Sequence, residues 1–329
     1  MQLKRAINFF ELWEMTGVVT MNNYDVIIVG AGPAGLTAAL FNARSKLKTL
    51  CIDEIGNGGQ AAITDLIENY PGFPEGITGS KLTIKMAEQV ERFGAEKITE
   101  KVQKLKLEEE YRVVVTNQSK YRAKAVIIAS GASPRMLGCP GEIDFRGRGV
   151  SYCATCDGAF YEGSNILVIG GGNAAVEEAV YLTKFADKVT LVHRRQELRA
   201  AKVAQERAFT NPKIDIIWDS VVEKISGNSS VEKVILKNVR SGERREMFVD
   251  GVFVYAGLEP NSAWVKGVVR LDEKGNILTD ENMCTNIKGV YAAGDVRRKL
   301  LRQVLTAASD GAIAAFHAER YIESQFYGS

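Results

Sequence analysis

Histidine and cysteine are scarce in this chain of 329 residues, which contains two histidines and five cysteines. The histidines, His193 and His317, are far apart in the sequence, and three of the cysteines stand singly. A structural zinc site needs four ligands from such residues, so we expect no metal. The odd number of cysteines and the lack of a secretion signal also argue against structural disulfides, and they favour a reducing, cytoplasmic compartment.

The chain also lacks an excess of charge of one sign and any long apolar run. Lys and Arg number 42 against 40 Asp and Glu, so neither nucleic acid nor a membrane surface is an expected partner. No apolar stretch approaches the ~20 residues of a transmembrane helix. Residues 1–20 match neither a signal peptide nor a transit peptide. We interpret them as an extension that adds nothing to the fold, with a docking helix as the alternative.

A nucleotide-binding pattern begins near the N-terminus of a chain long enough for about two domains. The apolar run 24–29 is typical of a parallel strand covered on both faces, and Gly-Ala-Gly-Pro-Ala-Gly follows it. A helix at 36–44 and a strand at 48–52 are expected next, and an acidic pair ends that strand. Strand, glycines, helix, strand and acid in this order predict a dinucleotide site.

Each position of this pattern has a physical reason. Gly30 permits the tight turn, Gly32 lets the backbone approach a pyrophosphate, and Gly35 lets the helix pack on the strand. The helix N-terminus faces the phosphates, and Asp53 is placed to bind a ribose hydroxyl. The candidate residues of this first site are Gly30, Gly32, Pro33, Ala34, Gly35, Asp53 and Glu54.

Three later segments are candidates for the same site. Residues 58–60 and 68–74 are expected as ordered loops whose glycines and prolines could merely shape turns. Loops at the carboxyl ends of parallel strands also line the ligand crevice, so Gly59, Gln60 and Asn69 are candidate cofactor contacts. After a helix at 81–93 and strands at 102–107, 111–116 and 126–129, residues 130–134 are expected to form a domain boundary, and Gly131 there is a further candidate.

The pair Cys153 and Cys156 is the most informative feature of the chain. Two cysteines three residues apart fit within one turn and can form a disulfide that opens and closes with little backbone movement. Such a pair suits a redox couple, and Asp157 is placed to exchange a proton with a thiolate beside it. Half of a zinc site is the alternative, which the absence of further ligands disfavours.

A second nucleotide-binding pattern follows the cysteines. A strand at 166–169 leads into the candidates Gly170, Gly172, Asn173, Ala174 and Ala175, with alanine in the place of the third glycine. The next expected strand, 188–192, does not end in an acid but in His193, Arg194 and Arg195, with Arg199 four residues later. Guanidinium groups bind a 2′-phosphate, so this site is predicted to prefer NADPH; a solvated basic helix start is the alternative.

The rest of the chain is expected to contain a hairpin and a final nucleotide-facing segment. Strands at 231–237 and 246–255 are joined by a turn at 240–242. A strand at 289–293 precedes Gly294 and Asp295, and a helix rich in alanine is expected at 304–322. Its small residues permit close packing, while its N-terminus, with Arg302 and Gln303, can also face an anionic ligand.

Two dinucleotide sites with a dithiol between them predict an electron path from NADPH through a second nucleotide to a disulfide. Hydride transfer and disulfide reduction each involve two electrons, and a flavin is the usual intermediary. The first site, with an acid at the ribose position, is therefore the better candidate for FAD.

The chain resembles the low-molecular-weight thioredoxin reductases from residue 21 to its end. The motifs that carry the resemblance are Cys-Ala-Thr-Cys-Asp-Gly at 153–158, Gly-Gly-Gly-Asn-Ala-Ala at 170–175, His-Arg-Arg at 193–195, and Ala-Gly-Asp at 293–295 with Arg-Gln at 302–303. The resemblance implies an α/β fold with two Rossmann-like, three-layer domains and a homodimer. An NADPH domain at 134–261, which carries the dithiol, would be inserted into a discontinuous FAD domain at 21–133 and 262–329.

The resemblance also implies roles for single residues. Cys156 would face the flavin, Cys153 would exchange with thioredoxin, and Asp157 would be the general acid. Gly294 and Asp295 would hold the ribityl and pyrophosphate part of FAD, with Gln303 near the ring. Larger disulfide reductases carry their cysteines just after the first nucleotide site, but Cys51 has no such partner here.

Other functions fit the same residues. A related enzyme could reduce another small protein disulfide, of a glutaredoxin-like or peroxiredoxin system. A dithiol oxidase should lack the arginines of the second site, and a non-enzymatic FAD and NADPH redox sensor would not need Asp157. The segment 296–301 is more basic than expected, which could alter the choice of partner.

Overall fold

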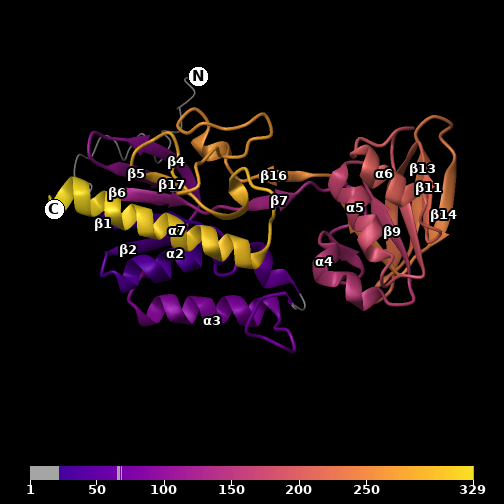
Figure 1. Cartoon of the computed structure of the whole chain (residues 1–329), viewed down its shortest axis with the longest axis horizontal. Helices are drawn as coiled ribbons and strands as arrows, with labels where there is room; N and C mark the ends of the chain where they lie inside the picture. Colours follow the sequence, from indigo (N-terminus) through magenta and orange to yellow (C-terminus); the bar gives the residue numbers. More distant parts are fainter. Residues whose placement is uncertain (1–21, 65–66, 68, 329) are drawn as a thin grey trace, which may run out of the picture.

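The computed structural model describes residues 22–64, 67 and 69–328. The expected extension at residues 1–20 lies outside the described residues. Two bodies, each built on a sheet with helices, lie side by side along the long axis of the molecule (Figure 1). The expected α/β class with parallel sheets is confirmed.

The larger body is built on a seven-stranded sheet of order β3-β2-β1-β6-β5-β4, with β17 paired to β6. Its strands are β1 (Asn22–Val29), β2 (Thr49–Asp53), β3 (Glu96–Thr99), β4 (Val102–Leu107), β5 (Arg112–Thr116), β6 (Lys120–Ile128) and β17 (Val290–Ala292). The strands β3, β2, β1, β6 and β17 pair in parallel, whereas β4 and β5 form an antiparallel extension. Only β3 has no counterpart among the expected strands of this sheet.

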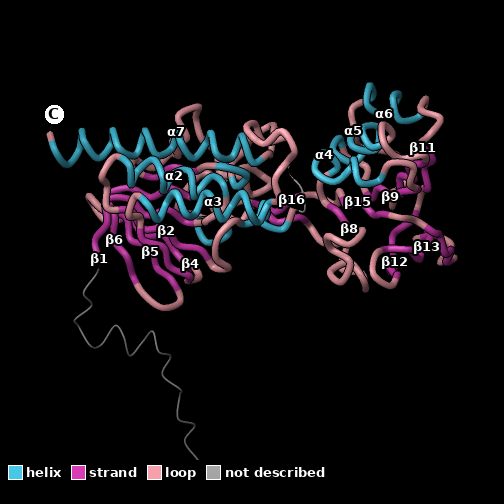
Figure 2. Tube along the Cα trace, turned by 90° about the horizontal axis from the view of Figure 1, so that it is seen from below, coloured by secondary structure: helices cyan, strands magenta, loops and turns pink. Residues whose placement is uncertain are grey.

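Three helices cover one side of this sheet (Figure 2). They are α2 (Pro33–Arg44), α3 (Gly79–Arg92) and α7 (Val304–Ile322). Along β1, Val26 and Ile28 pack toward these helices, while Ile27 and Val29 pack into a second core on the opposite side. The near-continuous apolar run of this strand follows from burial on both faces. Helix α7 can approach α2 closely because Gly311 has no side chain. A Cβ at that position would lie only 2.1 Å from the carbonyl oxygen of Ala34.

The smaller body is built on a five-stranded parallel sheet of order β11-β10-β9-β15-β8. Its strands are β8 (Val150–Ser151), β9 (Asn165–Ile169), β10 (Lys188–Val192), β11 (Ile214–Ile217) and β15 (Gly251–Val254). Helices α4 (Ala154–Asp157), α5 (Asn173–Leu182) and α6 (Lys202–Phe209) accompany it. An antiparallel sheet of β12 (Ser220–Gly227), β13 (Val231–Asn238) and β14 (Arg244–Phe248) packs against its other face.

Two expectations about local structure are wrong. The single strand expected at 246–255 is two strands, because the chain leaves the antiparallel ladder at β14 and enters the parallel sheet at β15. Phe248 is 72% exposed, whereas all four residues of β15 are buried. Gly59 and Gln60 were expected in a loop, but they begin the 3₁₀ helix η1 (Gly59–Ile63). Its N-cap residue, Gly58, has a φ of 106°.

The two bodies are joined by two short antiparallel strands, β7 (Ala132–Pro134) and β16 (Leu258–Pro260) (Figure 1). Gly131 and Gly257 flank this link at φ 68° and φ 120°, and neither would bring a Cβ within 4 Å of another residue. Both glycines adopt conformations that other residues rarely take, in open surroundings. Glycine is therefore the residue that suits both positions.

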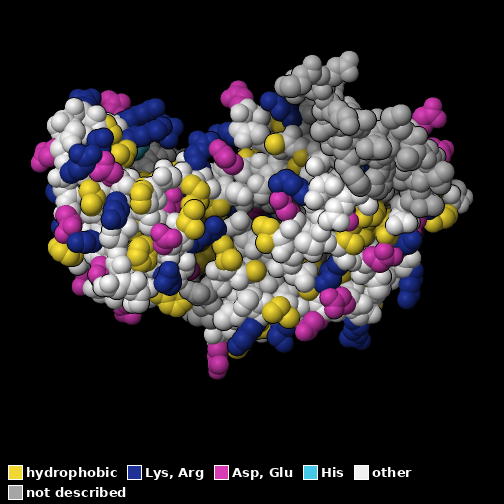
Figure 3. Space-filling view, turned by 180° about the vertical axis from the view of Figure 1, so that it is seen from behind, with side chains coloured by type: hydrophobic (Ala, Val, Ile, Leu, Met, Phe, Trp, Pro, Cys, Tyr) yellow, Lys and Arg dark blue, Asp and Glu magenta, His cyan; other side chains and the backbone are white. Residues whose placement is uncertain are grey.

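The surface carries mixed charge on the face seen in Figure 3, where Lys and Arg alternate with Asp and Glu over both bodies. Within the described part of the chain, no helix combines the length and apolar character that crossing a membrane requires.

Candidate active site

The predicted dithiol forms a disulfide at the start of the one-turn helix α4. The Cys153 and Cys156 Cα atoms are 5.3 Å apart, and the two sulfur atoms are bonded. Cys153 is the N-cap residue, with extended backbone, and Asp157 ends the turn. Both cysteines are half-buried, so the disulfide is accessible yet held by the protein.

Asp157 is held in place by Ser151, a residue that the sequence analysis did not single out. The Ser151 hydroxyl donates to Asp157 Oδ2 at 2.5 Å and accepts the backbone N–H of Cys153 at 3.1 Å. One side chain therefore fixes the carboxylate and the first cysteine relative to each other. Because Ser151 lies on β8, the parallel sheet positions the redox centre.

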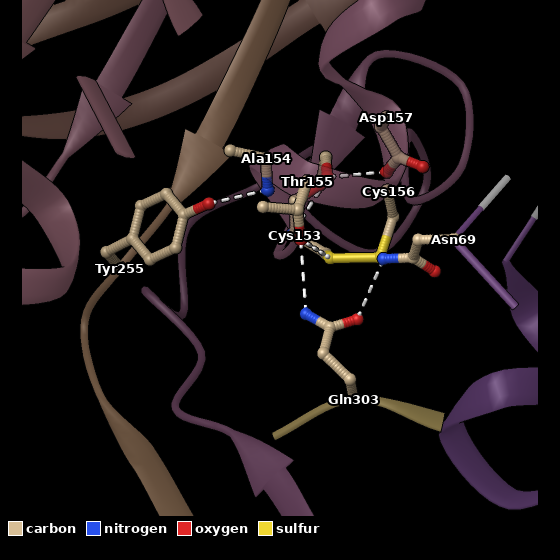
Figure 4. Close-up of a disulfide and its surroundings, with 9 residues drawn as sticks. Asn69, Cys153, Ala154, Thr155, Cys156, Asp157, Tyr255 and Gln303 are labelled. Atoms are coloured by element: carbon tan, nitrogen blue, oxygen red, sulfur yellow. Dashed lines mark hydrogen bonds between the residues drawn. A yellow bond between two sulfur atoms is a disulfide. The ribbon is translucent and has the colours of Figure 1, made fainter. Parts of the chain in front are cut away.

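The dithiol turn lies against the larger body (Figure 4). Gln303 Nε2 donates to the Thr155 hydroxyl at 3.2 Å, and Asn69 Nδ2 donates to Gln303 Oε1 at 3.2 Å. A second contact between the bodies joins Arg146 Nη2 to Gln60 Oε1 at 2.8 Å. Gln60, Asn69 and Gln303, which the sequence predicts at a cofactor, thus gather at the boundary that the disulfide faces.

Tyr255 anchors the same turn from within the smaller body. Its hydroxyl accepts the backbone N–H of Ala154 at 2.7 Å, across 101 residues of sequence (Figure 4). Burial, with a contribution from Glu178, raises the pKa of Tyr255 well above its usual value, so the side chain stays neutral. No local signal identifies this residue, because it lies at the end of an apolar strand.

The first glycine loop has the geometry that its sequence predicts. A Cβ on Gly30 would lie 2.2 Å from the Ala129 carbonyl oxygen, and one on Gly35 would lie 1.7 Å from the Gly30 carbonyl oxygen. Gly32, the N-cap residue of α2, has nothing within 4 Å of such a Cβ. Two glycines are therefore required by packing, and the third leaves open space at a helix N-terminus, where a phosphate can bind.

The acidic residues at the end of β2, Asp53 and Glu54, make different contacts. The Asp53 carboxylate accepts the N–H groups of Ala31, Ile55 and Gly56 at 2.7–2.9 Å. It therefore ties the glycine loop to the end of β2. Glu54 forms an exposed ion pair with Lys101 at 2.7 Å.

The segment from Gly294 to Gln303 returns to the N-terminus of α2. Gly294, at φ 75°, lies so close to α2 that a Cβ would be 2.9 Å from Ala34 Cβ. Asp295 Oδ1 and Arg302 Nε are buried without a hydrogen-bond partner among the described residues. Burial raises the pKa of Asp295, while Lys299 and Arg302 lower it. An acceptor and a donor left unsatisfied beside an open glycine loop fit a bound nucleotide, whose hydroxyl and phosphate groups would satisfy them.

The second glycine loop repeats this arrangement in the smaller body. Gly172 is the N-cap residue of α5, and a Cβ there would meet nothing within 4 Å. Gly170 and Ala175 pack tightly, since a Cβ on the glycine would lie 2.5 Å from that of the alanine. Asn173 Oδ1 accepts the Ala201 N–H at 2.7 Å, and Ala174 is exposed on the first turn of the helix.

The four basic residues after β10 separate into two groups. Arg194, Arg195 and Arg199 are exposed, and no carboxylate of the described residues pairs with their side chains. His193 is only 4% exposed, and its ring fills the space where a Cβ on Gly171 would lie. Burial lowers the pKa of His193, so it shapes the glycine loop as a neutral ring. The arginines remain the cationic candidates for a 2′-phosphate.

The other cysteines are poor thiolates. Burial raises the pKa of Cys51 to about 12 and that of Cys139 to about 11, and it also raises the pKa of Cys284. Because the thiolate is the nucleophile, these thiols are unreactive near neutral pH. No group of three or more possible metal ligands occurs among the described residues.

Comparison with known proteins agrees with this geometry. Residues 24–311 match the model of the family described as pyridine nucleotide-disulphide oxidoreductase. A thioredoxin reductase of Peptoclostridium acidaminophilum is 51% identical over 311 residues, covering 93% of this chain and 99% of that protein.

Two solved structures add a geometric comparison. The thioredoxin reductase of Streptococcus pyogenes MGAS5005 is 50% identical with a TM-score of 0.87, and that of Lactococcus lactis, in what is called its FR conformation, is 47% identical with a TM-score of 0.66. Each covers 92% of this chain, which covers 99% of each. From sequence pattern, site geometry and these similarities together, the chain belongs to the thioredoxin reductases of the pyridine nucleotide-disulphide oxidoreductase family.

Proposed function

We propose that this oxidoreductase transfers electrons from NADPH through FAD and the Cys153–Cys156 disulfide to an oxidised thioredoxin. The observation that carries the proposal is the position of the disulfide. It lies on the body with the arginine-flanked glycine loop, and it faces the body with the other glycine loop. Membership of the family implies a flavin and a pyridine nucleotide, and the two loops provide a site for each.

The larger body is the proposed FAD site. The open N-terminus of α2 at Gly32 would bind the pyrophosphate, and the unsatisfied Asp295 and Arg302 would bind the ribityl and phosphate groups. Asn69 and Gln303, whose amides lie beside the dithiol turn, would contact the flavin. Bound FAD supplies the two-electron exchange between hydride and sulfur.

The smaller body is the proposed NADPH site. Gly170, Gly172 and Ala175 form the phosphate-facing turn, and Arg194, Arg195 and Arg199 would bind the 2′-phosphate. Exposed guanidinium groups without carboxylate partners leave their donors available for this phosphate. Domain boundaries at 134–261 for this unit, and at 21–133 and 262–329 for the FAD unit, are part of the proposal.

The dithiol passes the electrons on by exchange. Two electrons and two protons convert the Cys153–Cys156 disulfide to two thiols, one proton being held or moved at the Asp157 carboxylate. The Cys153 thiolate then attacks one sulfur of the partner's disulfide and releases the other as a thiolate. Cys156 attacks Cys153, which releases the reduced partner and restores the disulfide. NADPH, a proton and a disulfide thus become NADP⁺ and two thiols.

A rotation of the smaller body completes the proposed cycle. The pyridine nucleotide and the disulfide belong to the same body, and both must reach one flavin, so they are expected to do so in turn. Two relatives of nearly equal identity differ widely in TM-score, which supports different arrangements of two similar bodies. The glycines at the linkers provide the required backbone freedom.

The substrate is tested by steady-state NADPH oxidation with a panel of disulfides: thioredoxin, a glutaredoxin-like protein and a peroxiredoxin-system protein. Thioredoxin should give the largest kcat/KM. A larger kcat/KM for another protein would assign the enzyme to that partner. If no protein of the panel supports NADPH oxidation, a non-enzymatic redox sensor is favoured. A homodimer and a cytoplasmic location are further parts of the proposal, which gel filtration and localisation of the tagged protein would test.

A further inference from the structure

The basic segment from Val296 to Leu301 is not a uniform surface patch. Leu300 is fully exposed, but Lys299 and Arg297 turn inward toward α7, where their side chains are 7% and 13% exposed. Both reach one oxygen atom of Asp310. The expectation that this segment alters partner choice therefore does not apply to these two residues.

Asp310 Oδ2 contacts two groups of this segment and one group just before it. It accepts the Gly294 N–H at 3.0 Å and the Lys299 ammonium at 2.7 Å, and it lies 3.2 Å from Arg297 Nη1. Asp310 is itself buried on the second turn of α7. A single carboxylate thus fixes the two buried cations of the segment and the backbone of Gly294, which precedes it.

The two cations differ in how else they are held. Arg297 Nε also donates to Thr279 Oγ1 at 2.9 Å. The Lys299 ammonium has Asp310 as its only hydrogen-bond or ion-pair partner among the described residues. Loss of the Asp310 charge would therefore release Lys299 but leave Arg297 attached.

Asp295 is a second carboxylate that attracts Lys299. The pKa of Asp295 is raised by burial and lowered by Lys299, so the two charges already interact. Its Oδ1 nonetheless has no partner among the described residues. The Lys299 ammonium is bound to Asp310 and does not pair with this oxygen.

We propose that Asp310 is a positioning residue for the flavin: by binding Lys299 and the Gly294 N–H, it keeps the Asp295 carboxylate free to accept a ribityl hydroxyl. This role rests on the proposed FAD site. In this role the inward-facing Lys299 balances the charge of Asp310 and does not contact the flavin.

The test measures how fast FAD leaves the purified full-length holoenzyme, as the rise of flavin fluorescence after dilution. Asp310→Asn keeps the shape and an acceptor for Gly294 but loses the charge. It should release FAD roughly tenfold faster, as expected when a hydrogen bond to a charged group is lost. Lys299→Met alone should change the rate by less than about threefold, because Gly294 and Arg297 still bind Asp310. The double variant should recover most of the wild-type rate, because no ammonium is left to occupy Asp295.

The controls separate this role from general destabilisation. Asp215→Asn removes the exposed ion pair with Lys188 and should not change FAD release. A double variant no better than Asp310→Asn, or an unchanged Asp310→Asn, would overturn the proposal. If Asp310→Asn does not fold, Lys299→Met decides, since rapid FAD release by that variant would mean that Lys299 itself binds the flavin. A wild-type chain that holds no FAD would contradict the flavin site itself.

Discussion

The Ser151 hydroxyl lies 2.5 Å from Asp157 Oδ2 and so fixes the carboxylate beside the disulfide. Since Ser151 belongs to β8, the carboxylate is tied to the sheet and not only to the short helix that carries the cysteines.

Asp157→Asn removes the group proposed to move the proton. Turnover with thioredoxin should fall on the order of 10²–10⁴-fold, the usual contribution of general acid–base catalysis, while both nucleotides stay bound. Ser151→Ala should lower kcat by a smaller factor, roughly tenfold, because it removes one hydrogen bond to a charged group. Steady-state kinetics and nucleotide titration check both variants. Normal turnover by Asp157→Asn would assign the proton transfer to water or another residue.

Replacing Arg194 and Arg195 with Gln should change the cofactor preference. Each lost charge-assisted contact with the 2′-phosphate costs about 1.5–3 kcal/mol, so the KM for NADPH should rise roughly tenfold or more per arginine. The KM for NADH, which has no such phosphate, should stay almost unchanged. Arg207→Gln, on α6 of the same body, is a control for the loss of one positive charge, as in each single replacement. Equal weakening toward both nucleotides would remove the arginines from the 2′-phosphate site.

His193 should make stability depend on pH in the weakly acidic range. Its pKa is lowered in the folded chain, so below its unfolded value of about 6.5 the unfolded state binds a proton that the folded state does not. The free energy of unfolding should therefore fall as the pH drops through this range, by up to about 1.4 kcal/mol per pH unit. His193→Phe keeps a ring against Gly171 but cannot titrate. Denaturant unfolding between about pH 7 and pH 5 should show a wild-type loss, relative to this variant, that grows toward acid; a constant difference would contradict the assignment.

Fixing the two bodies together should stop the cycle. Arg146 and Gln60, which form a hydrogen bond across the boundary, can be replaced by cysteines and joined by a non-reducible bismaleimide while the native disulfide is oxidised. The bridged enzyme should keep FAD, but NADPH should no longer reduce the flavin. The unbridged double variant and each labelled single variant serve as controls. Full thioredoxin reduction by the bridged enzyme would exclude the rotation.

The glycine loops could be predicted from the sequence because their constraints are local. Gly30 and Gly35 pack within a few residues of each other or on a neighbouring strand, and a short pattern encodes this packing. The prediction of a single strand at 246–255 was wrong because the change between sheets depends on distant strands. Apolar content alone does not reveal that Val249 and Asp250 lead from one sheet into another.

The supporting contacts of the site could not be predicted because they join distant segments. Thr155 and Gln303 are 148 residues apart, and Ala154 and Tyr255 are 101 apart. Asp310 lies in a helix whose alanines predict only close packing. Its hydrogen bond with Lys299 is therefore seen only in the folded structure. Sequence motifs identify groups that carry chemistry, whereas the residues that orient them depend on the tertiary arrangement.

The central claim is that electrons from NADPH reach thioredoxin only through Cys153 and Cys156. The most direct measurement counts, without oxygen, the thioredoxin thiols formed for each NADPH oxidised by the wild type, Cys153→Ser and Cys156→Ser. The wild type should form two thiols per NADPH, and each variant should form none while still binding FAD and accepting electrons from NADPH. Thiol formation at the wild-type rate by either variant would contradict the account.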